Sequence, residues 1–574
     1  MIGLISATAA GAAARNRLAA AWPDRTRVYE GPVGDAVRAA FAECEQLVCF
    51  LATGAVVRLV APLLEGKAAD PGVVCVDEGG RFAVSLLGGH GGGANELAAE
   101  VGRLLGAEPV VTTATDSAGL AGLDTLGLPV EGDVAGVSRA LLDGEPVVLD
   151  AEVAWPLPAL PALPQAGGEE AQGAPVIRVT DRAVEPGAHE VVLRPPSLVV
   201  GVGASRGVAA EEVLGLVEGA LREAGLSARS VDRLATVDAK SGEPGLITAA
   251  ERLGVPLVTY SAQELAAVTV PNPSRAPLDA VGTPSVAEAA ALAGGGELLV
   301  PKRKSERADG APAMATCAVV RRPVRGRLAV VGLGPGARDL LTPRAEAELR
   351  RASVLVGLDQ YVDQIRDLLR PGTRILESGL GAEEERARTA VAEARAGHAV
   401  ALIGSGDAGV YAMASPALAE ASDDIDVVGV PGVTAALAAG AVLGAPLGHD
   451  HVSISLSDLH TPWEVIERRV RAAAEADLVV TFYNPRSRGR DWQLPKALAI
   501  LAEHREPGTP VGVVRNASRR DESSRLTTLA GLDPATVDMM TVVTVGNTAT
   551  REIAGRMVTP RGYRWQDTRP EEAR

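Results

Sequence analysis

Short apolar runs that end in Gly, Ser or Thr, each followed by a stretch rich in Ala, Arg and Glu, recur along the whole chain of 574 residues. Residues 46–64 (QLVCFLATGAVVRLVAPLL) have the pattern of a strand, a tight turn and a helix, and residues 82–106 repeat it. Such alternation predicts parallel sheets with helices on their faces. Because a chain of this length exceeds what one hydrophobic core supports, we expect a multidomain α/β fold.

Charge and composition exclude several classes of protein. The net charge of −16 at pH 7 argues against nonspecific binding to nucleic acid. The opening MIGLISATAAG lacks a basic segment and is predicted to be a buried strand, not a signal peptide. No window of 18 residues is apolar and free of charge, so we expect no membrane partner and a cytoplasmic location. No C-x-x-C pair signals a disulfide framework or a zinc site among Cys44, Cys49, Cys75 and Cys317.

Composition shifts predict where the domains end. Residues 155–175 contain five prolines and show no helical or strand period, which favours an irregular connection. A new first strand begins soon after residue 323. The predicted order is an α/β domain, a Pro/Gly-rich connection, a second α/β domain, a third α/β unit and a polar tail, over residues 1–154, 155–195, 196–322, 326–558 and 559–574.

The glycine loop GLGPG at 332–336 first suggests a dinucleotide site, with Asp359 as the acidic ribose ligand of an NAD-dependent oxidoreductase. Pro335 argues against this, because proline lacks the backbone N–H that a pyrophosphate would need. Thr342 and Pro343 predict that the next helix starts several residues too late to face a phosphate. A strand-end turn without a ligand is the other alternative for the loop taken alone.

Four ordered motifs supply a better explanation: GLGPG, GSGDAGVY at 404–411, VPGVTAA at 430–436 and FYNPRS at 482–487. Together they resemble the tetrapyrrole methylase family over residues 327 to about 558. SLSDLHTPW at 455–463 resembles the precorrin-3B C17-methyltransferase branch more narrowly. The resemblance implies a two-lobed domain that binds S-adenosylmethionine between its lobes, methylates a tetrapyrrole precursor and forms a homodimer.

The resemblance also implies the residues of the cofactor cleft. Asp407 is expected near the polar end of the cofactor, and the small residues at the start of the following helix would let the backbone approach it. Because a sulfonium is already an activated methyl donor, we expect no nucleophile triad. The implied cleft residues are Pro335, Gly406, Asp407, Val410, Thr434, Ala435, Tyr483 and Ala517.

A tetrapyrrole precursor carries many carboxylates, for which arginine is the favoured partner. We therefore expect arginines near the motifs to line the substrate trough, with a plain surface role as the alternative for each. The candidates are Arg486, Arg488, Arg490, Arg515 and Arg519. Three histidines, His449, His451 and His460, lie close together in the sequence. No carboxylate or cysteine completes a convincing ligand set with them, so we expect no metal site.

Two loops of the N-terminal half could carry chemistry. In LLGGHGGGANELA (86–98), dense glycine allows close approach of a ligand, and His90 could act as an acid or base near neutral pH. A tight turn with an incidental histidine is the alternative. In ATVDAKSGEPGL (235–246), Asp238, Lys240 and Glu243 share one loop, for which a solvated loop is the alternative.

These loops, with GVGASRGV (201–208), VGTPSVAEAAAL (281–292) and LLVPKRKS (298–305), resemble cobalt-precorrin-5A hydrolase over residues 1 to about 322. The resemblance implies opening of a δ-lactone with release of acetaldehyde. We expect His90, Glu243 and Lys240 to be the catalytic residues. His90 and Glu243 would move protons, and Lys240 and Arg206 would hold carboxylates.

The sequence therefore predicts a bifunctional enzyme of corrin synthesis. Its C-terminal half would methylate C17 of precorrin-3B or cobalt-factor III with ring contraction, and its N-terminal half would hydrolyse the lactone. A noncatalytic tetrapyrrole-binding module is the alternative for the N-terminal half. Whether the substrate carries cobalt stays open.

Overall fold

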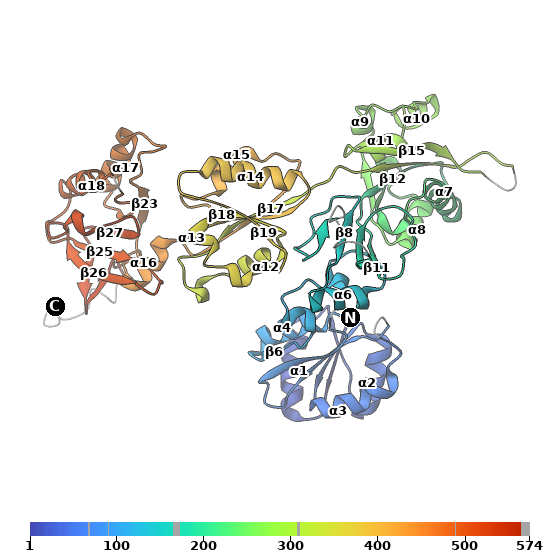
Figure 1. Ribbon diagram of the computed structural model, residues 1–574, viewed down its shortest axis with the longest axis horizontal. Helices are drawn as coiled ribbons and strands as arrows, with labels where there is room; N and C mark the ends of the chain where they lie inside the picture. The colour runs from blue at the N-terminus through green and yellow to red at the C-terminus, as the bar shows by residue number, and fades with distance from the viewer. Residues whose placement is uncertain (67–68, 90, 165–172, 307–309, 488, 564–574) are drawn as a thin grey trace. The chain divides into compact units, whose positions relative to one another are not determined.

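The computed structural model describes residues 1–66, 69–89, 91–164, 173–306, 310–487 and 489–563. It divides the chain into two compact units, Met1–Val324 with Arg370–Gly372, and Arg325–Leu369 with Thr373–Arg574. Both units consist of sheets flanked by helices (Figure 1). The predicted multidomain α/β fold is confirmed. No helix among the described residues combines the length and apolar character that crossing a bilayer requires.

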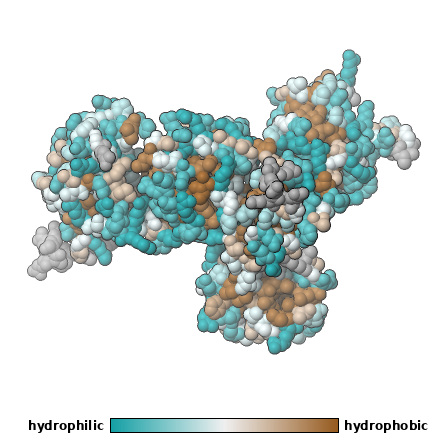
Figure 2. Space-filling model, viewed as in Figure 1, coloured by the Kyte–Doolittle hydropathy of each residue, from teal (hydrophilic) through white to brown (hydrophobic). Residues whose placement is uncertain are grey.

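The first domain is a six-stranded sheet in the order β2-β1-β3-β4-β5-β6, in which only β4 and β5 pair antiparallel. Apolar clusters cover both of its faces, which explains why β3 and β4 are almost entirely apolar. On the face that Figure 2 shows, apolar residues gather over this domain. The elements are β1 (Ile2–Ser6), α1 (Ala9–Ala21), β2 (Thr26–Val28), α2 (Val33–Glu43), β3 (Gln46–Phe50), α3 (Thr53–Val60), β4 (Gly72–Val76), β5 (Phe82–Leu87), α4 (Ala94–Leu105), β6 (Glu108–Val110) and α5 (Ala114–Ser117).

A second, smaller domain corrects the predicted connection at 155–195. Its five-stranded sheet has the order β7-β11-β10-β8-β9, and three of these strands, β9, β10 and β11, lie inside the range expected to be irregular. They escape sequence analysis because each has only two to four residues and lies in or after a proline-rich or polar stretch. The elements are β7 (Val130–Gly132), α6 (Val134–Asp143), β8 (Val148–Ala151), β9 (Leu163–Pro164), β10 (Val176–Val179) and β11 (Glu190–Leu193).

The third domain spans Leu198–Arg321 and has the strand order β14-β13-β12-β16-β15. Strands β12 and β13 are parallel neighbours, so the loops that follow them lie at the same edge of the sheet. The elements are β12 (Leu198–Ala204), α7 (Ala210–Glu223), β13 (Val231–Val237), α8 (Pro244–Leu253), β14 (Leu257–Tyr260), α9 (Ala262–Ala266), α10 (Arg275–Val281), α11 (Ala287–Leu292), β15 (Glu297–Lys304) and β16 (Ala315–Arg321).

The second unit begins with a fully parallel sheet in the order β19-β18-β20-β17-β21. Thr342 caps α12 through its side chain and Pro343 is the first helical residue, as the sequence predicts. The elements of this first lobe are β17 (Arg327–Gly332), α12 (Pro343–Arg351), β18 (Val354–Leu358), α13 (Asp359–Val362), β19 (Arg374–Ser378), α14 (Glu383–Arg395), β20 (Ala399–Gly404), α15 (Ala414–Glu420) and β21 (Asp426–Val430).

The second lobe has the strand order β23-β24-β27-β25-β26. Strands β24 and β25 both run antiparallel to β27, so their carboxyl ends lie at the edge where β27 begins. The elements are α16 (Ala435–Leu443), β23 (His451–Ser455), α17 (Trp463–Glu475), β24 (Val479–Tyr483), α18 (Gln493–Ala502), β25 (Pro510–Arg515), β26 (Ser523–Thr528) and β27 (Thr541–Val545), with a small sheet of β22 (Gly444–Ala445), β28 (Arg551–Ile553) and β29 (Arg556–Val558).

Candidate functional site

Three motif loops meet at the carboxyl edge of the first sheet of the second unit. Strand β17 lies between β20 and β21, and all three run in the same direction. The register pairs Gly332 with Gly404, so β17 and β20 end side by side. Beyond them, Gly334 and Gly406 exchange two backbone hydrogen bonds of 3.0 and 2.8 Å. The carboxyl edge of an open α/β sheet is a common place for ligand binding.

Glycine is required where these loops cross. A Cβ on Gly432 would lie 2.2 Å from the Gly406 carbonyl oxygen and 2.7 Å from that of Gly332. A Cβ on Gly332 would lie 2.7 Å from the same Gly406 oxygen. Gly406 itself has a φ of +70°, which favours glycine over other residues. The backbones of all three loops therefore pack directly on one another.

Asp407 ties the second loop to the third. Its Oδ1 accepts a hydrogen bond from the Gly409 N–H (2.8 Å), and its Oδ2 accepts one from the Gly432 N–H (3.0 Å). The carboxylate is half-buried, and Val410 follows it in the same turn. Asp407 thus fixes the shape of the edge and leaves a partly exposed negative charge there.

Tyr483, the last residue of β24, joins the second lobe to the start of α16. Its hydroxyl lies 2.6 Å from Thr434 Oγ1 and accepts the Ala436 N–H at 2.7 Å. Burial is the main reason why the pKa of Tyr483 is raised above its usual value. The phenol therefore stays neutral and keeps donating and accepting across the physiological range.

Two further side chains link the lobes, and sequence analysis missed the role of both. The Tyr411 hydroxyl donates to the Ser453 carbonyl oxygen at 2.7 Å, and its ring lies 5.2 Å from that of Tyr483. Tyr411 has a φ of +51°, a strained backbone conformation for a bulky residue. Arg519 donates from Nε to the carbonyl oxygen of the buried Pro335 at 3.0 Å.

Ala517, two residues before Arg519, is buried and packs in an apolar cluster with Leu443 and Met557. It follows β25, at the same edge of the second sheet as Tyr483. Hydrogen bonds of Tyr483 to Thr434 and of Arg519 to Pro335 connect the loops and strand ends of this unit that carry the predicted cleft residues. These residues are Pro335, Gly406, Asp407, Val410, Thr434, Ala435, Tyr483 and Ala517.

The predicted substrate arginines of this unit have different surroundings. Arg515 is held by Asp538 (2.7 Å) and Asp521 (3.3 Å), and its hydrogen bond to Asp538 raises its pKa further. Arg486 donates to the Ala535 carbonyl oxygen at 2.7 Å. Arg488 lies outside the described residues. The structure thus gives Arg515 and Arg486 partners within the chain.

The histidines of the second lobe are exposed. His451 is the first residue of β23, and His449 precedes the strand. The His449 Nδ1 accepts the Asp450 N–H at 2.7 Å, and His451 Nδ1 lies 3.1 Å from the His449 carbonyl oxygen. Across the described part of the chain, no group of three or more His, Cys, Asp or Glu side chains is placed to hold a metal ion.

In the first unit, Glu243 and Lys240 meet at the edge formed by β12 and β13. Glu243 is buried (8% exposed), and its Oε1 accepts the Gly207 N–H at 2.8 Å. Its Oε2 lies 3.4 Å from Lys240 Nζ. Arg206, the neighbour of Gly207, is exposed. The two loops thus place two cations and one buried carboxylate at one edge.

The other predicted residue of this unit, His90, lies outside the described residues. A polar network surrounds the following helix start and was not predicted. The buried Asn95 accepts from Ser85 Oγ (2.7 Å) and donates to Thr113 Oγ1 and Asp116 Oδ2, both at 3.0 Å. Sequence analysis could not predict this network, because its four residues are far apart in the sequence and follow no helical or strand period.

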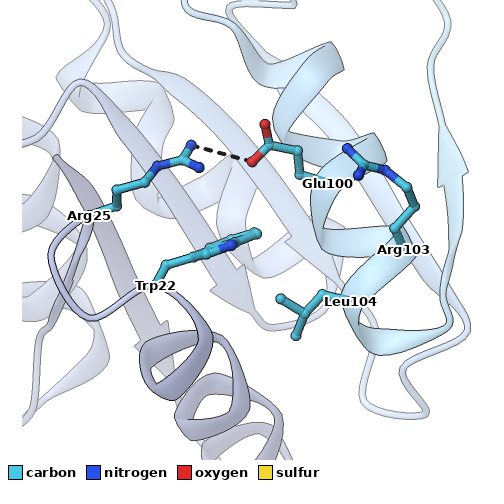
Figure 3. Close-up of a pocket in the computed structure, with 5 residues that line it drawn as sticks. All are labelled: Trp22, Arg25, Glu100, Arg103 and Leu104. Atoms are coloured by element: carbon cyan, nitrogen blue, oxygen red, sulfur yellow. Dashed lines mark hydrogen bonds and ion pairs between the residues drawn. The ribbon is translucent and has the colours of Figure 1, made fainter. Parts of the chain in front are cut away.

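A surface pocket of the first domain involves none of the predicted residues. Figure 3 shows Trp22 and Arg25 on one side and residues of α4 on the other, with Arg25 Nη2 3.3 Å from Glu100 Oε2. The Arg25 guanidinium also lies 5.3 Å above the Trp22 ring. These side chains are bound to each other, and nothing in the pocket favours a specific ligand.

Comparison with known proteins identifies the second unit. Residues 327–533 match the tetrapyrrole (corrin/porphyrin) methylases. A Salmonella typhimurium protein named "Probable cobalt-factor III C(17)-methyltransferase" is 47% identical over 239 residues, which are 41% of this chain and 99% of that protein. The chain belongs to the tetrapyrrole methylase family.

A further relative agrees with this family membership. The precorrin-3B C(17)-methyltransferase of Sinorhizobium sp is 42% identical over 39% of this chain and 91% of its own length. The crystal structure of the methyltransferase CobJ is 40% identical over 41% of this chain and 100% of its own, with a TM-score of 0.40. The motif-based resemblance of the second unit is confirmed.

Two of the domains that precede the tetrapyrrole methylase domain match families of their own. Residues 35–116 match the cobalamin synthesis G N-terminal family, and residues 198–320 match the cobalamin synthesis G C-terminus family. The predicted fusion is therefore confirmed. The small domain between them, which includes β8, β10 and β11, lies outside both matches.

Proposed function

We propose that the tetrapyrrole methylase domain transfers a methyl group from S-adenosylmethionine to C17 of precorrin-3B or cobalt-factor III, with ring contraction. The observation that carries this proposal is the 47% identity to a C17-methyltransferase over 99% of that protein's length. The convergence of the glycine loops at one sheet edge supports the cofactor part of the proposal.

The residues at the edge fit the cofactor. Gly406, Thr434 and Ala435 present backbone and small side chains, and a Cβ on Gly406 would have only ordinary contacts of 3.7 Å or more. The partly exposed Asp407 carboxylate suits the ammonium group of the methionine moiety. Bound S-adenosylmethionine supplies a methyl group on a sulfonium, so the domain needs no nucleophilic side chain.

The domain's own contribution is therefore positioning. Asp407 holds the loops that contain Gly406 and Gly432, while Tyr483 fixes the start of α16. Tyr411 and Arg519 add two bonds between the lobes. These contacts would set the distance between the glycine loops of the first lobe, where we place the cofactor, and the second lobe, which carries the candidate substrate arginines.

Isotope labelling tests the methyl transfer. Purified protein is incubated with methyl-labelled S-adenosylmethionine and either cobalt-factor III or precorrin-3B, and the product is analysed by mass spectrometry. We expect one added labelled methyl and a ring-contracted product. Which of the two is methylated decides whether the substrate carries cobalt, and inertness toward both would refute the assignment.

Tyr483→Phe should weaken binding of S-adenosylhomocysteine by up to about thirtyfold. The variant keeps the ring but loses the bonds to Thr434 and to the Ala436 N–H, each of which is worth about 1 kcal/mol. Isothermal titration calorimetry measures the affinity, with Tyr361→Phe in α13 as the control. Because the pKa of Tyr483 is raised, the wild-type affinity should not fall as the pH reaches about 10. Unchanged affinity in Tyr483→Phe would remove Tyr483 from the site.

We also propose that the first unit hydrolyses the lactone of cobalt-precorrin-5A and releases acetaldehyde. The cobalamin synthesis G matches support this, together with the buried Glu243 beside Lys240 and the Gly207 N–H. Water attack on a lactone needs a base and a cation or N–H group for the developing oxyanion. Glu243 would supply the base, Lys240 the cation and Arg206 a contact to a substrate carboxylate, with His90 as a second acid/base group.

Glu243→Gln should lower acetaldehyde release at least about a hundredfold, the usual weight of general base catalysis. The amide oxygen can still accept the Gly207 N–H, so the loop should keep its shape. Acetaldehyde is measured in a coupled assay with cobalt-precorrin-5A, and Glu251→Gln on the exposed face of α8 is the control. Release at the wild-type rate by Glu243→Gln would remove Glu243 as the base, whereas binding of the macrocycle without acetaldehyde release by the unsubstituted chain would favour a noncatalytic tetrapyrrole-binding module.

We further propose that the tetrapyrrole methylase domain forms a homodimer. Large apolar side chains of this domain, Leu418 and Leu437, are more than half exposed on α15 and α16, at 57% and 54%. Light scattering after size exclusion should then give twice the chain mass of 58.7 kDa. A mass of a single chain would refute the dimer.

A further inference from the structure

Arg490 is a buried arginine of the second lobe, on the loop that follows β24. The residue is only 7% exposed. Its Nη1 donates to the Asn484 carbonyl oxygen at 2.6 Å, and its Nε donates to Ser487 Oγ at 3.2 Å. Asn484 directly follows Tyr483, which contacts Thr434. Arg490 therefore contacts the residue that follows Tyr483, whose hydroxyl joins the two lobes.

The charge of Arg490 has no close anion. Within the described residues, no carboxylate lies at salt-bridge distance from its guanidinium, whereas Arg515 at the same sheet edge contacts both Asp538 and Asp521. Burial lowers the pKa of Arg490, and the more distant charge of Asp458 offsets this only in part. A buried cation without a counter-ion is unfavourable, so an anion that reached it would be bound strongly.

A thioether occupies the place where a carboxylate would be expected. Arg490 Nη2 lies 3.5 Å from the sulfur of Met539, and sulfur is a weak hydrogen-bond acceptor. Met539 is 48% exposed, in the turn that precedes β27. The Asn516 N–H bond to the Met540 carbonyl oxygen (2.9 Å) fixes the backbone of this turn. The flexible Met539 side chain can thus leave Nη2 without a change of the backbone.

We propose that Arg490 is a carboxylate-binding subsite for an acetate or propionate side chain of the macrocycle, which displaces Met539 from Nη2. This inference rests on the proposed methyltransferase function. Its position favours the macrocycle, because Arg490 reaches the turn before β27 while the glycine loops and Asp407 belong to the other lobe. The cofactor carboxylate offers the same chemistry, and the experiment below separates the two sources.

Met539→Glu tests the subsite without removing Arg490. The new carboxylate should pair with Nη2, raise the midpoint of thermal unfolding and compete with the substrate. We expect the KM for the methylated macrocycle to rise at least about tenfold, while the affinity for S-adenosylhomocysteine stays within twofold of wild type. Met540→Glu, which adds the same charge at an exposed neighbour (39%), is the matched control and should keep a KM close to wild type.

Each result decides between the alternatives. A normal KM in Met539→Glu would overturn the subsite, and so would an equal rise in Met540→Glu. Loss of S-adenosylhomocysteine affinity with a normal KM would assign Arg490 to the cofactor and overturn the macrocycle assignment. Failure of the unsubstituted chain to methylate either macrocycle would instead overturn the proposed function, and the subsite with it.

Discussion

Gly432→Ala is expected to weaken binding of S-adenosylhomocysteine by about one to two orders of magnitude, with a matching loss of methyl transfer. A Cβ at this position lies 2.2 Å from the Gly406 carbonyl oxygen, and the atoms it meets are backbone. Neither loop can yield by rotating a side chain, because Asp407 and the Gly334–Gly406 bonds hold both in place. Overpacking of this kind costs about 1–3 kcal/mol, which corresponds to that loss of affinity.

Gly429→Ala is the matched control for this prediction. Gly429 lies three residues earlier, in β21, and a Cβ there would meet nothing within 4 Å. Titration calorimetry on both variants should therefore separate a clash at the loop crossing from a general cost of alanine. If Gly432→Ala binds as tightly as Gly429→Ala, the meeting of the three loops does not form the cofactor site.

The sequence predicts the parts of the structure that local signals control. Thr342 and Pro343 begin α12 as expected, since capping and a fixed proline φ act within one turn. The motif loops meet because the carboxyl ends of parallel strands share one edge, a consequence of the βαβ pattern. Family membership could be predicted for the same reason: the motifs are contiguous in the sequence.

The remaining features depend on contacts between distant residues. The bond from Arg519 to Pro335 spans 184 positions, and the one from Tyr411 to Ser453 spans 42. No periodicity reports such pairs, and nothing in the sequence distinguishes the buried Arg490 from Arg515 with its two carboxylates. The small sheet with β10 and β11 was missed because its short strands gain stability only from pairing with β7 and β8.

Arg321→Met should destabilise the first unit by about 3–5 kcal/mol, the largest effect on stability that we expect from one substitution. Arg321, at the end of β16, makes two hydrogen bonds of 2.6 and 2.8 Å to Asp181, whose side chain is fully buried after β10. Removal of the guanidinium leaves a buried carboxylate with only Ser197 Oγ at 2.8 Å. Breaking a buried pair from one side typically has this cost. Calorimetry on the full chain measures the shift, with the exposed Arg252→Met as the control, for which about 0–1 kcal/mol is expected.

The pH dependence of this loss separates electrostatics from packing. Burial raises the pKa of Asp181, but the hydrogen bonds from Arg321 and Ser197 outweigh it and leave the pKa below its usual value. A carboxyl with a lowered folded pKa stabilises the protein above the pKa of the unfolded chain, about 3.9, and loses that contribution as the pH falls through the folded pKa. The gap between wild type and Arg321→Met should therefore be full at pH 7 and narrow below about pH 4. A gap that is constant with pH would mean that the Arg321 side chain acts through packing, and that the ion pair contributes nothing to holding the second and third domains together.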